Sequence, residues 1–282
     1  MAEEFQPVVH IAWKGEVYRP ATFRELQARG VYNVLWHPDE TLPEWLPPLA
    51  KASDLFCTQY KGMMDTYRAA GIQNLGWLLD GITPSFFEYD EITAEEREKY
   101  ACEVVTIGTV DRIPEYCKRL YALNRLIREE FDILWWGRRM SFRRNSLRDW
   151  FSPGRRAWGR AKVWNETFAK ACHCAKIFLA LPRCPEVSGG LSNRAFWVTG
   201  IGAFTLTLYK QGIEEFFEPG KEIVVFHDED ERVEKVRYYL AHDDEREAIA
   251  RAGQRRTLGE YTNQHLLEGL FKRLAQGGGP KA

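Results

Sequence analysis

Residues 102–112 read CEVVTIGTVDR, and they carry the clearest signal of the fold. Its first six residues form a largely apolar, β-branched run, which is typical of a strand covered on both faces. Gly108 ends the run, and a helix is predicted to open near Pro114. A strand, a glycine turn and a helix are the units from which layered α/β folds with parallel sheets are built.

The same alternation of strand and helix runs along the whole 282-residue chain, without internal repeats. Thr22 and Thr93, each followed three residues later by glutamate, fit capping boxes at helix starts. Gly30 and Gly71 stand where two helices are predicted to stop. The predicted strands are Val8–Trp13, Val31–His37, Asp54–Thr58, Ile72–Leu78, Cys102–Ile107, Asp132–Trp136, Lys176–Ala180, Ala203–Thr207 and Glu222–Phe226.

Two domains are predicted, with the boundary between Asp80 and Ala101, where one α/β run ends and a charged helical stretch begins. We expect an abbreviated N-terminal domain over residues 1–90 and a C-terminal domain over residues 91–275. Residues 276–282 are expected to form a flexible tail. Three consecutive helices are predicted near the end of the chain, over Asp228–Leu240, Asp243–Arg256 and Thr262–Ala275.

The composition is that of an ordinary globular protein, with 45% hydrophobic and 28% charged residues. It excludes a disordered chain, a collagen-like chain and a coiled coil. The formal net charge is −1, so no global field draws the protein to nucleic acid or membrane. No apolar run approaches the roughly 20 residues needed to span a bilayer. Because the acidic start, MAEEFQPVVH, is not typical of a secretory signal, we expect a cytoplasmic protein.

The six cysteines are predicted to be reduced thiols, since no secretory signal precedes them. Cys172, His173 and Cys174, with Cys184, raise the possibility of a zinc site. The C-x-C spacing, on a segment predicted as a helix end running into a strand, instead favours buried thiols. We therefore predict no metal site.

Three strand-to-helix turns are the candidate ligand sites, at residues 108–112, 137–138 and 189–194. Ligands of parallel sheets bind beyond the carboxyl ends of the strands, where helix N-termini attract phosphate. In the third turn, two glycines permit close backbone approach before a helix capped by Ser192 or Asn193. The glycines of any one turn can serve only to make it tight, but three turns in one domain favour a nucleotide or phosphate ligand. Neither GxGxxG nor GxxxxGK[ST] occurs, which disfavours a dinucleotide fingerprint and a P-loop.

The C-terminal half carries a series of specific motifs: SNRAF at 192–196, GIGAF at 200–204, GIEEFFEPGKEIV at 212–224, YYLAH at 238–242 and EYTNQH at 260–265. Together they resemble CgeB-type (spore-maturation) glycosyltransferases, a branch of the retaining GT-B superfamily. The resemblance is clear over Lys176–Leu270 and looser back to Val8. It implies a GT-B fold, in which two Rossmann-like domains face a cleft. It also implies a metal-independent hexosyltransferase that needs no cofactor and uses a nucleotide-sugar donor, above all a UDP-sugar, with retention.

The resemblance also implies which residues form the site. Val31–His37, followed by Pro38 and Asp39, resembles the strand after which such enzymes place a cleft histidine, so His37 and Asp39 are the predicted catalytic residues. For His37 alone, a capping or core role is the alternative. The predicted donor-binding residues are Gly108, Thr109, Arg112, Gly137, Arg138, Gly190, Ser192, Asn193, Arg194 and Glu214.

The family's two glutamates, eight positions apart, are replaced by Gly189 and Trp197. The branch often has an apolar residue at the second position, so we interpret the change as a trait of the branch. Glu186 or Glu214 is the candidate to replace the lost carboxylates.

Two further departures concern the arginine of the donor site and the N-terminal domain. The arginine that often follows the donor-domain glycine is Thr109, which leaves Arg112 or Arg194 to neutralise the diphosphate. The N-terminal domain is short, because the first strand–helix–strand of the usual domain is missing. Either this domain is reduced or the chain is a fragment.

A basic segment between Gly137 and Lys162 belongs to no motif; its nine cationic residues and one anionic residue, Asp149, give a local net charge of +8. Four aromatic residues are interleaved with the charges: Trp150, Phe151, Trp158 and Trp164. Guanidinium groups neutralise phosphate while rings stack, so the segment suits an anionic polymer or single-stranded nucleic acid. The alternative is a solvated helix–loop–helix whose aromatics pack on the sheet. The predicted acceptor or polyanion residues are Arg143, Arg144, Arg155 and Arg156.

Two other functions stay open at this point. The missing glutamates and the short N-terminal domain are compatible with a catalytically silent GT-B-like protein that binds a nucleotide, a glycan or a polyanion. A sugar-nucleotide epimerase on the same fold is the third hypothesis. The expected partners are a nucleotide-sugar and an acceptor, which is a polymer, a protein or a nucleic acid if it is anionic.

Overall fold

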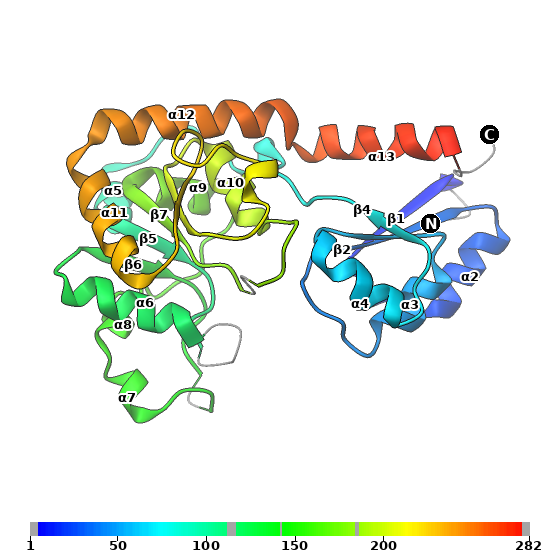
Figure 1. Cartoon of the computed structure of the whole chain (residues 1–282), viewed down its shortest axis with the longest axis horizontal. Helices are drawn as coiled ribbons and strands as arrows, with labels where there is room; N and C mark the ends of the chain where they lie inside the picture. The colour runs from blue at the N-terminus through cyan, green and yellow to red at the C-terminus, as the bar shows by residue number, and fades with distance from the viewer. Residues whose placement is uncertain (1–4, 112–116, 142, 184–185, 278–282) are drawn as a thin grey trace. The chain divides into compact units, whose positions relative to one another are not determined.

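The computed structural model describes residues 5–111, 117–141, 143–183 and 186–277, and it contains two parallel sheets (Figure 1). The chain forms two compact units. Unit 1 consists of Met1–Gly81, Glu186–Leu191 and Asn263–Ala282. Unit 2 consists of Ile82–Pro185 and Ser192–Thr262. Each unit is built around its own sheet and its own hydrophobic core.

Unit 1 has a four-stranded sheet in the order β1-β2-β3-β4, which buries apolar side chains on both faces. One face packs against α2, α3 and α4 through residues that include Phe23, Leu49 and Tyr67. On the other face, Trp36 and Cys57 pack with residues of α13. The elements are β1 (Val9–Trp13), α2 (Pro20–Ala28), β2 (Tyr32–His37), α3 (Leu46–Ala52), β3 (Leu55–Thr58), η1 (Lys61–Met63), α4 (Met64–Ala69), β4 (Leu75–Trp77) and α13 (Asn263–Gly277).

Unit 2 has a five-stranded sheet in the order β6-β5-β7-β8-β9, covered by helices on both faces. Trp135 faces the cluster that α6 and α11 join, and the adjacent Trp136 faces the cluster that α5, α9 and α10 join. The strands are β5 (Cys102–Ile107), β6 (Ile133–Trp136), β7 (Ala175–Ala180), β8 (Thr205–Leu208) and β9 (Val224–Phe226). The helices are η2 (Pro84–Phe86), α5 (Ala94–Tyr100), α6 (Cys117–Arg128), α7 (Leu147–Trp150), α8 (Pro153–Arg156), α9 (Asn165–Cys174), α10 (Asn193–Ile201), η3 (Ile213–Glu215), α11 (Glu229–Ala241) and α12 (Asp243–Glu260).

All nine predicted strands are present, with ends shifted by at most a few residues. The capping box at Thr93 is confirmed, because its Oγ1 accepts the Glu96 N–H at 3.2 Å and the Glu96 carboxylate accepts the Thr93 N–H at 3.0 Å. The capping box at Thr22 is wrong. Helix α2 begins at Pro20, whose ring pre-sets a helical φ, so Thr22 already lies inside the first turn. Gly30 and Gly71 do follow the ends of α2 and α4, at φ values of +79° and +80°.

The unit boundary at Gly81 and Ile82 lies inside the predicted interval, but the units are not contiguous in sequence. Helix α13 and residues 186–191 were expected in the C-terminal domain, and both belong to unit 1. Leu270 and Leu274 of α13 find their apolar partners on the N-terminal sheet, and no local pattern encodes such a long-range choice. Helix α13 continues to Gly277, and the rest of the predicted tail lies outside the described residues.

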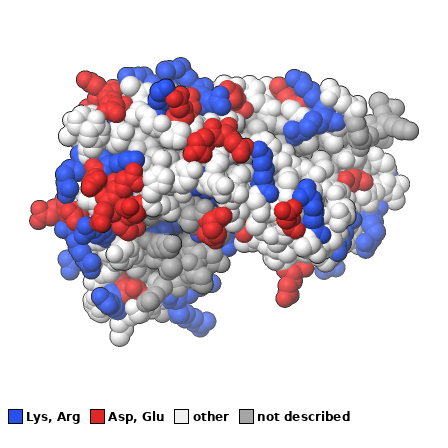
Figure 2. Space-filling view, viewed as in Figure 1, with Lys and Arg blue, Asp and Glu red and all other residues white. Residues whose placement is uncertain are grey.

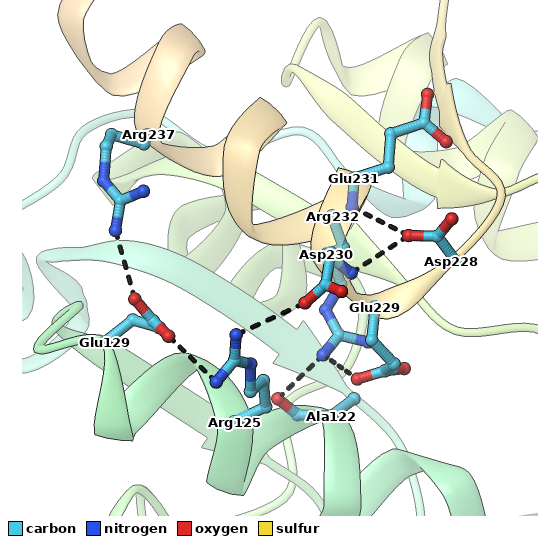
Figure 3. A network of polar contacts seen from close by, with 9 residues as sticks. All are labelled: Ala122, Arg125, Glu129, Asp228, Glu229, Asp230, Glu231, Arg232 and Arg237. Atoms are coloured by element: carbon cyan, nitrogen blue, oxygen red, sulfur yellow. Dashed lines mark hydrogen bonds and ion pairs between the residues drawn. The ribbon is translucent and has the colours of Figure 1, made fainter.

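A polar network ties α11 to α6 in unit 2 (Figure 3). Arg232 is fully buried, donates to the Glu229 carboxylate and also donates to the carbonyl oxygen of Ala122 on α6 at 3.3 Å. Arg125 of α6 lies 3.0 Å from Glu129 and 3.3 Å from Asp230. The carboxylate of Asp228 accepts the N–H groups of Asp230 and Glu231, which caps α11. The acidic stretch at residues 228–230 therefore anchors the helix, and α6 is held in place against the sheet.

The predicted cysteine–histidine segment forms the end of α9 and the start of β7, as expected. Cys102 and Cys172 are buried, and burial raises the pKa of Cys102 to about 12. His173 donates from Nε2 to the Ile201 carbonyl at 3.0 Å, and Nδ1 accepts from the Tyr89 hydroxyl at 2.6 Å. Cys184 lies outside the described residues. Among the described residues, no group of three His, Cys, Asp or Glu side chains could hold a metal ion.

None of the helices in the described ranges combines the length and apolar character that crossing a bilayer requires.

We predict that Leu270→Ala lowers the free energy of unfolding of unit 1 by about 2–5 kcal/mol, the usual cost of emptying a buried leucine site. Leu270 is 1% exposed and packs in the cluster that α13 shares with β2 and β3. Hydrogen exchange of the β1–β4 amides during denaturation measures the effect on unit 1 separately from unit 2. The control is Phe271→Ala, at a side chain that is 45% exposed. Equal effects of the two substitutions would contradict the assignment of α13 to this core.

Candidate functional site

The turns that follow β5 and β6 touch through their backbones. The Gly108 N–H donates to the Trp136 carbonyl at 2.8 Å, and the Gly108 carbonyl accepts from Trp135 Nε1 at 2.6 Å. Gly108 has a φ of +144°, which favours glycine. A Cβ on Gly137 would lie 2.2 Å from the Gly108 oxygen, so no other residue fits at position 137 without displacing the turn. Two of the three predicted ligand turns therefore form one structure at the carboxyl edge of the sheet.

Two guanidinium groups converge on Gly108. A Cβ built on this glycine would lie 3.1 Å from Nη1 of Arg119 and 3.5 Å from Nη1 of Arg194. Arg119 comes from α6 and Arg194 from the first turn of α10. Arg119 is 7% exposed, and its guanidinium donates to the carbonyls of Leu181 and Thr109, each at 3.0 Å. Two convergent, partly buried guanidiniums favour an anionic ligand, above all a phosphate group.

The N-terminus of α10 adds backbone donors near Arg194. Ser192 occupies the N-cap position, as predicted, and Asn193 is the first residue of the nine-residue helix. Within the described part of the chain, the Ser192 side chain makes no capping hydrogen bond to the first N–H groups of α10. Such an N-terminus carries a partial positive charge that stabilises an anion. Arg194 and the N-terminus of α10 therefore both attract negative charge.

The two glycines of the third predicted turn have a different role. A Cβ on Gly189 would lie 2.7 Å from Cβ of Lys61, and one on Gly190 would lie 2.5 Å from the carbonyl oxygen of Gln59. The Lys61 N–H also donates to the Gly189 carbonyl at 3.0 Å. These glycines let the backbone at residues 189–190 pack closely against residues 59–62 of unit 1.

Asp111 organises the loop that follows Gly137. Its side chain, 1% exposed, accepts from Arg138 at 3.0 Å, from the Ser141 N–H at 2.8 Å and from Asn145 Nδ2 at 3.0 Å. Burial raises the pKa of Asp111, but the three donors outweigh burial and leave the pKa below its ordinary value. Arg138 is thus neutralised by a carboxylate. Arg112 lies outside the described residues.

A further set of polar residues follows the carboxyl end of β8. Lys210 is only 2% exposed, and its carbonyl accepts the Ile213 N–H at 3.0 Å, which begins η3. Glu214 is exposed on η3, and its hydrogen bond to Tyr209 raises the pKa of that phenol. Glu214 thus lies next to a strand end, where a ligand-binding carboxylate is expected. Trp197, which stands in place of a family glutamate, packs against Phe87 with ring centroids 5.6 Å apart.

In unit 1, His37 is a buried residue with 1% exposure. Its ring packs edge-on against Trp45, with centroids 5.8 Å apart, and lies 6.5 Å from that of Phe56. Burial lowers the pKa of His37, and the nearby Asp39 opposes that shift. Asp39 itself forms an ion pair with Lys14 at 3.0 Å. These contacts are compatible with the core role that the sequence left open as the alternative, and the catalytic role of His37 stays a prediction.

In the basic segment, Arg143, Arg144, Arg155 and Arg156 are exposed. Two of the four interleaved aromatic residues are packed within the protein, as in the alternative interpretation of this segment. Trp150 is 6% exposed, and Trp158 donates from Nε1 to the Gly137 carbonyl at 3.0 Å. The other two, Phe151 and Trp164, are 82% and 65% exposed. The segment is therefore anchored by two rings and presents its charges to solvent.

Sequence reasoning missed Arg119, Asp111 and Lys210. Arg119 lies in the helical pattern CKRLYALNRLIR at residues 117–128, where it has the signature of a solvated cation. Asp111 and Lys210 follow predicted strands by a few residues, and that position is a usable signal for both. Their burial depends on packing that the pattern does not contain.

We predict that Asp111→Asn lowers the free energy of opening of the 138–145 loop by about 1–3 kcal/mol, the usual cost of losing hydrogen bonds to a charged acceptor. Because the pKa of Asp111 is lower in the folded protein than in the unfolded chain, its contribution is present above the ordinary value of about 4 and is lost as pH falls through the folded pKa. Hydrogen exchange of residues 138–145 measures both effects. Asp65→Asn, at a fully solvated carboxylate of α4, is the control and should change nothing. Unchanged protection in Asp111→Asn at neutral pH would contradict this role.

Residues 118–272 match the model of a family described as glycosyl transferase-like. No curated protein matches the sequence.

Several solved structures match nearly the whole chain. A glycosyltransferase from Rickettsia africae is similar with a TM-score of 0.68 at 8% identity, over 96% of this chain and 77% of that one. HepE of Anabaena, solved in complex with UDP-glucose, has a TM-score of 0.66 at 10% identity, over 94% and 79%. Sucrose-phosphate synthase of Thermosynechococcus elongatus has a TM-score of 0.64 at 10% identity, over 98% and 76%. These similarities establish the GT-B fold.

Proposed function

The chain belongs to the glycosyl transferase-like family, and from this premise we propose that it transfers a sugar from a nucleoside diphosphate to an acceptor hydroxyl. The observation that carries the proposal is the convergence of Arg119 and Arg194 on Gly108. It lies at the carboxyl edge of a parallel sheet, beside the N-terminus of α10, where the fold binds ligands. A diphosphate matches two cations and a helix dipole in charge and in geometry.

We propose UDP as the nucleotide, because HepE of Anabaena, which shares the fold, was solved with UDP-glucose. The motifs at residues 192–196 and 212–224 support membership of the CgeB-type branch. Gly108, Gly137, Asn193 and the two arginines would hold the diphosphate. Glu214 is the candidate partner for the ribose hydroxyls, since Trp197 is engaged in packing.

The proposed reaction proceeds with retention and is balanced without a protein nucleophile. The bond from the anomeric carbon to the diphosphate oxygen breaks, and a bond to the acceptor oxygen forms on the same face. The acceptor proton passes to the departing diphosphate. Arg119 and Arg194 would stabilise the negative charge that develops on the diphosphate, and that stabilisation lowers the barrier. The protein's part is thus to position the donor and to neutralise its leaving group.

Incubation with UDP-glucose tests the proposal, with release of UDP as the readout. Turnover supports a transferase. Tight UDP binding without release of UDP, with or without added acceptors, would favour the silent binding protein instead. Formation of an epimerised nucleotide-sugar would favour the epimerase.

We predict that Arg194→Ala weakens the binding of UDP by about 1.5–3 kcal/mol, the scale of a hydrogen bond to a charged group. Isothermal titration calorimetry measures the change directly. The matched control is Arg251→Ala on α12, at an exposed arginine that pairs with Glu247 and should leave UDP affinity unchanged. Equal affinities of the wild type and Arg194→Ala would remove Arg194 from the donor site.

We also predict that turnover survives EDTA. The charge that a divalent cation supplies to a leaving diphosphate is supplied here by the guanidiniums of Arg119 and Arg194. Initial rates before and after chelation check the expectation. A loss of rate that manganese restores would overturn it.

A further inference from the structure

One end of unit 2 carries an unusual concentration of positive charge. In Figure 2, separate blue groups and one small red group lie at the end of this unit at which α7 lies in Figure 1. We define the arginine surface as the five exposed residues around α7 and α8: Arg143, Arg144, Arg148, Arg155 and Arg156. In the part of the chain that the structure describes, none of these five forms an ion pair with a carboxylate. Asp149, which lies among them, is held by the Ser146 N–H and hydroxyl, each at 2.8 Å.

Two large apolar side chains stand in the middle of these charges. Leu147 is 76% exposed and Phe151 is 82% exposed. The Phe151 N–H donates to the Leu147 carbonyl at 3.2 Å, so the two residues are one helical turn apart and share a face of α7. Exposed apolar residues of this size, adjacent to one another and surrounded by cations, mark an interaction site.

The exposure of these side chains is fixed by the packing beneath them. Trp150, between them in sequence, is 6% exposed and belongs to the core cluster of α6 and β6. The guanidinium of Arg155 lies 4.6 Å from the centroid of its ring. In α8, the Gly154 N–H donates to Asn124 of α6 at 2.7 Å. Because α7 and α8 are anchored through these contacts, Leu147 and Phe151 are held outward while Trp150 is held inward.

We propose that the arginine surface binds the face of an anionic phospholipid bilayer, with Leu147 and Phe151 inserted among the lipids. Guanidinium groups bind the phosphates of headgroups in bidentate fashion, and an aliphatic and an aromatic side chain partition into the acyl boundary. Such a contact lies at the interface and needs no membrane-spanning helix.

A lipid surface fits these residues better than single-stranded nucleic acid does. Binding of single strands requires exposed rings on which bases stack. Trp150 is buried, and Trp158 is engaged by the Gly137 carbonyl, so Phe151 at the end of α7 is the exposed ring among the five arginines, and Trp164 is exposed before α9. Leu147 has no use in stacking, whereas it contributes directly to insertion into lipid.

The test compares binding of the full chain to vesicles by co-sedimentation. One set contains phosphatidylcholine with about one third phosphatidylglycerol, and the other contains phosphatidylcholine alone. We expect binding to the anionic vesicles only, weakened by added salt through screening of the charges. Leu147→Ser/Phe151→Ser should reduce binding by about tenfold or more, since burial of these side chains is lost. Each Arg→Gln change at positions 143, 144, 148 and 156 should reduce it by about fivefold.

The controls are Leu258→Ser and Arg255→Gln, at exposed residues of α12, which should bind vesicles like the wild type. Unchanged affinity for UDP in every variant would show that the donor site is intact. A failure of the bilayer proposal is therefore distinguishable from a failure of the proposed transferase activity. Absence of binding to anionic vesicles would overturn the proposal. A second pair of results would also overturn the proposal. In that case a single-stranded oligonucleotide binds as tightly as the vesicles do, and Leu147→Ser/Phe151→Ser leaves vesicle binding unchanged. That result would assign the surface to a soluble polyanion.

Discussion

The backbone contact between Gly108 and Gly137 is the constraint on which the site of unit 2 depends. With a Cβ of residue 137 only 2.2 Å from the Gly108 oxygen, the two turns can meet only where side chains are missing. The indole of Trp135 fixes the same oxygen from the core side. The guanidiniums of Arg119 and Arg194 lie next to Gly108, where a Cβ at this position would meet them. Electrostatic preorganisation of this kind requires rigid supports, and here these are a strand end and two helices.

The fold could be predicted from sequence to a large extent, because buried parallel strands have a clear signal. Each strand is a short, nearly continuous apolar run between helical patterns, and the structure contains all nine. Errors arose where two local signals competed or where the partner was remote. Pro20 starts α2 two residues before Thr22, which also fits a cap. Helix α13 was predicted from the sequence, but its packing on the N-terminal sheet depends on a long-range contact.

The candidate site could be predicted only in part, and the physical reason is burial. Glycine turns and the start of α10 are local features, so Gly108 and Arg194 were identified. Arg119 is as important geometrically, yet in sequence it is one of several cations on an amphipathic helix. His37 and Gly190 are residue types that suit a ligand, and the structure gives both of them close packing contacts within unit 1. Their predicted ligand roles stay predictions. Residue types and their spacing therefore identify the edge of the sheet that carries the candidate site. The three-dimensional contacts show which side chains lie at that site.

The net charge of the chain does not describe how its charges are distributed. The formal net charge of −1 excludes a strong electrostatic field around the whole protein. It does not exclude local groups of like charge that lie more than one screening length from the opposite charges. That length is about 8 Å at physiological ionic strength. At the start of α11, Asp230 pairs with Arg125 of α6 and Glu229 pairs with Arg232 of the same helix (Figure 3). The acidic residues that open α12 lie on a different element from α7 and α8. A nearly neutral chain therefore still carries five exposed arginines around α7 and α8, with the exposed Leu147 and Phe151 among them in sequence.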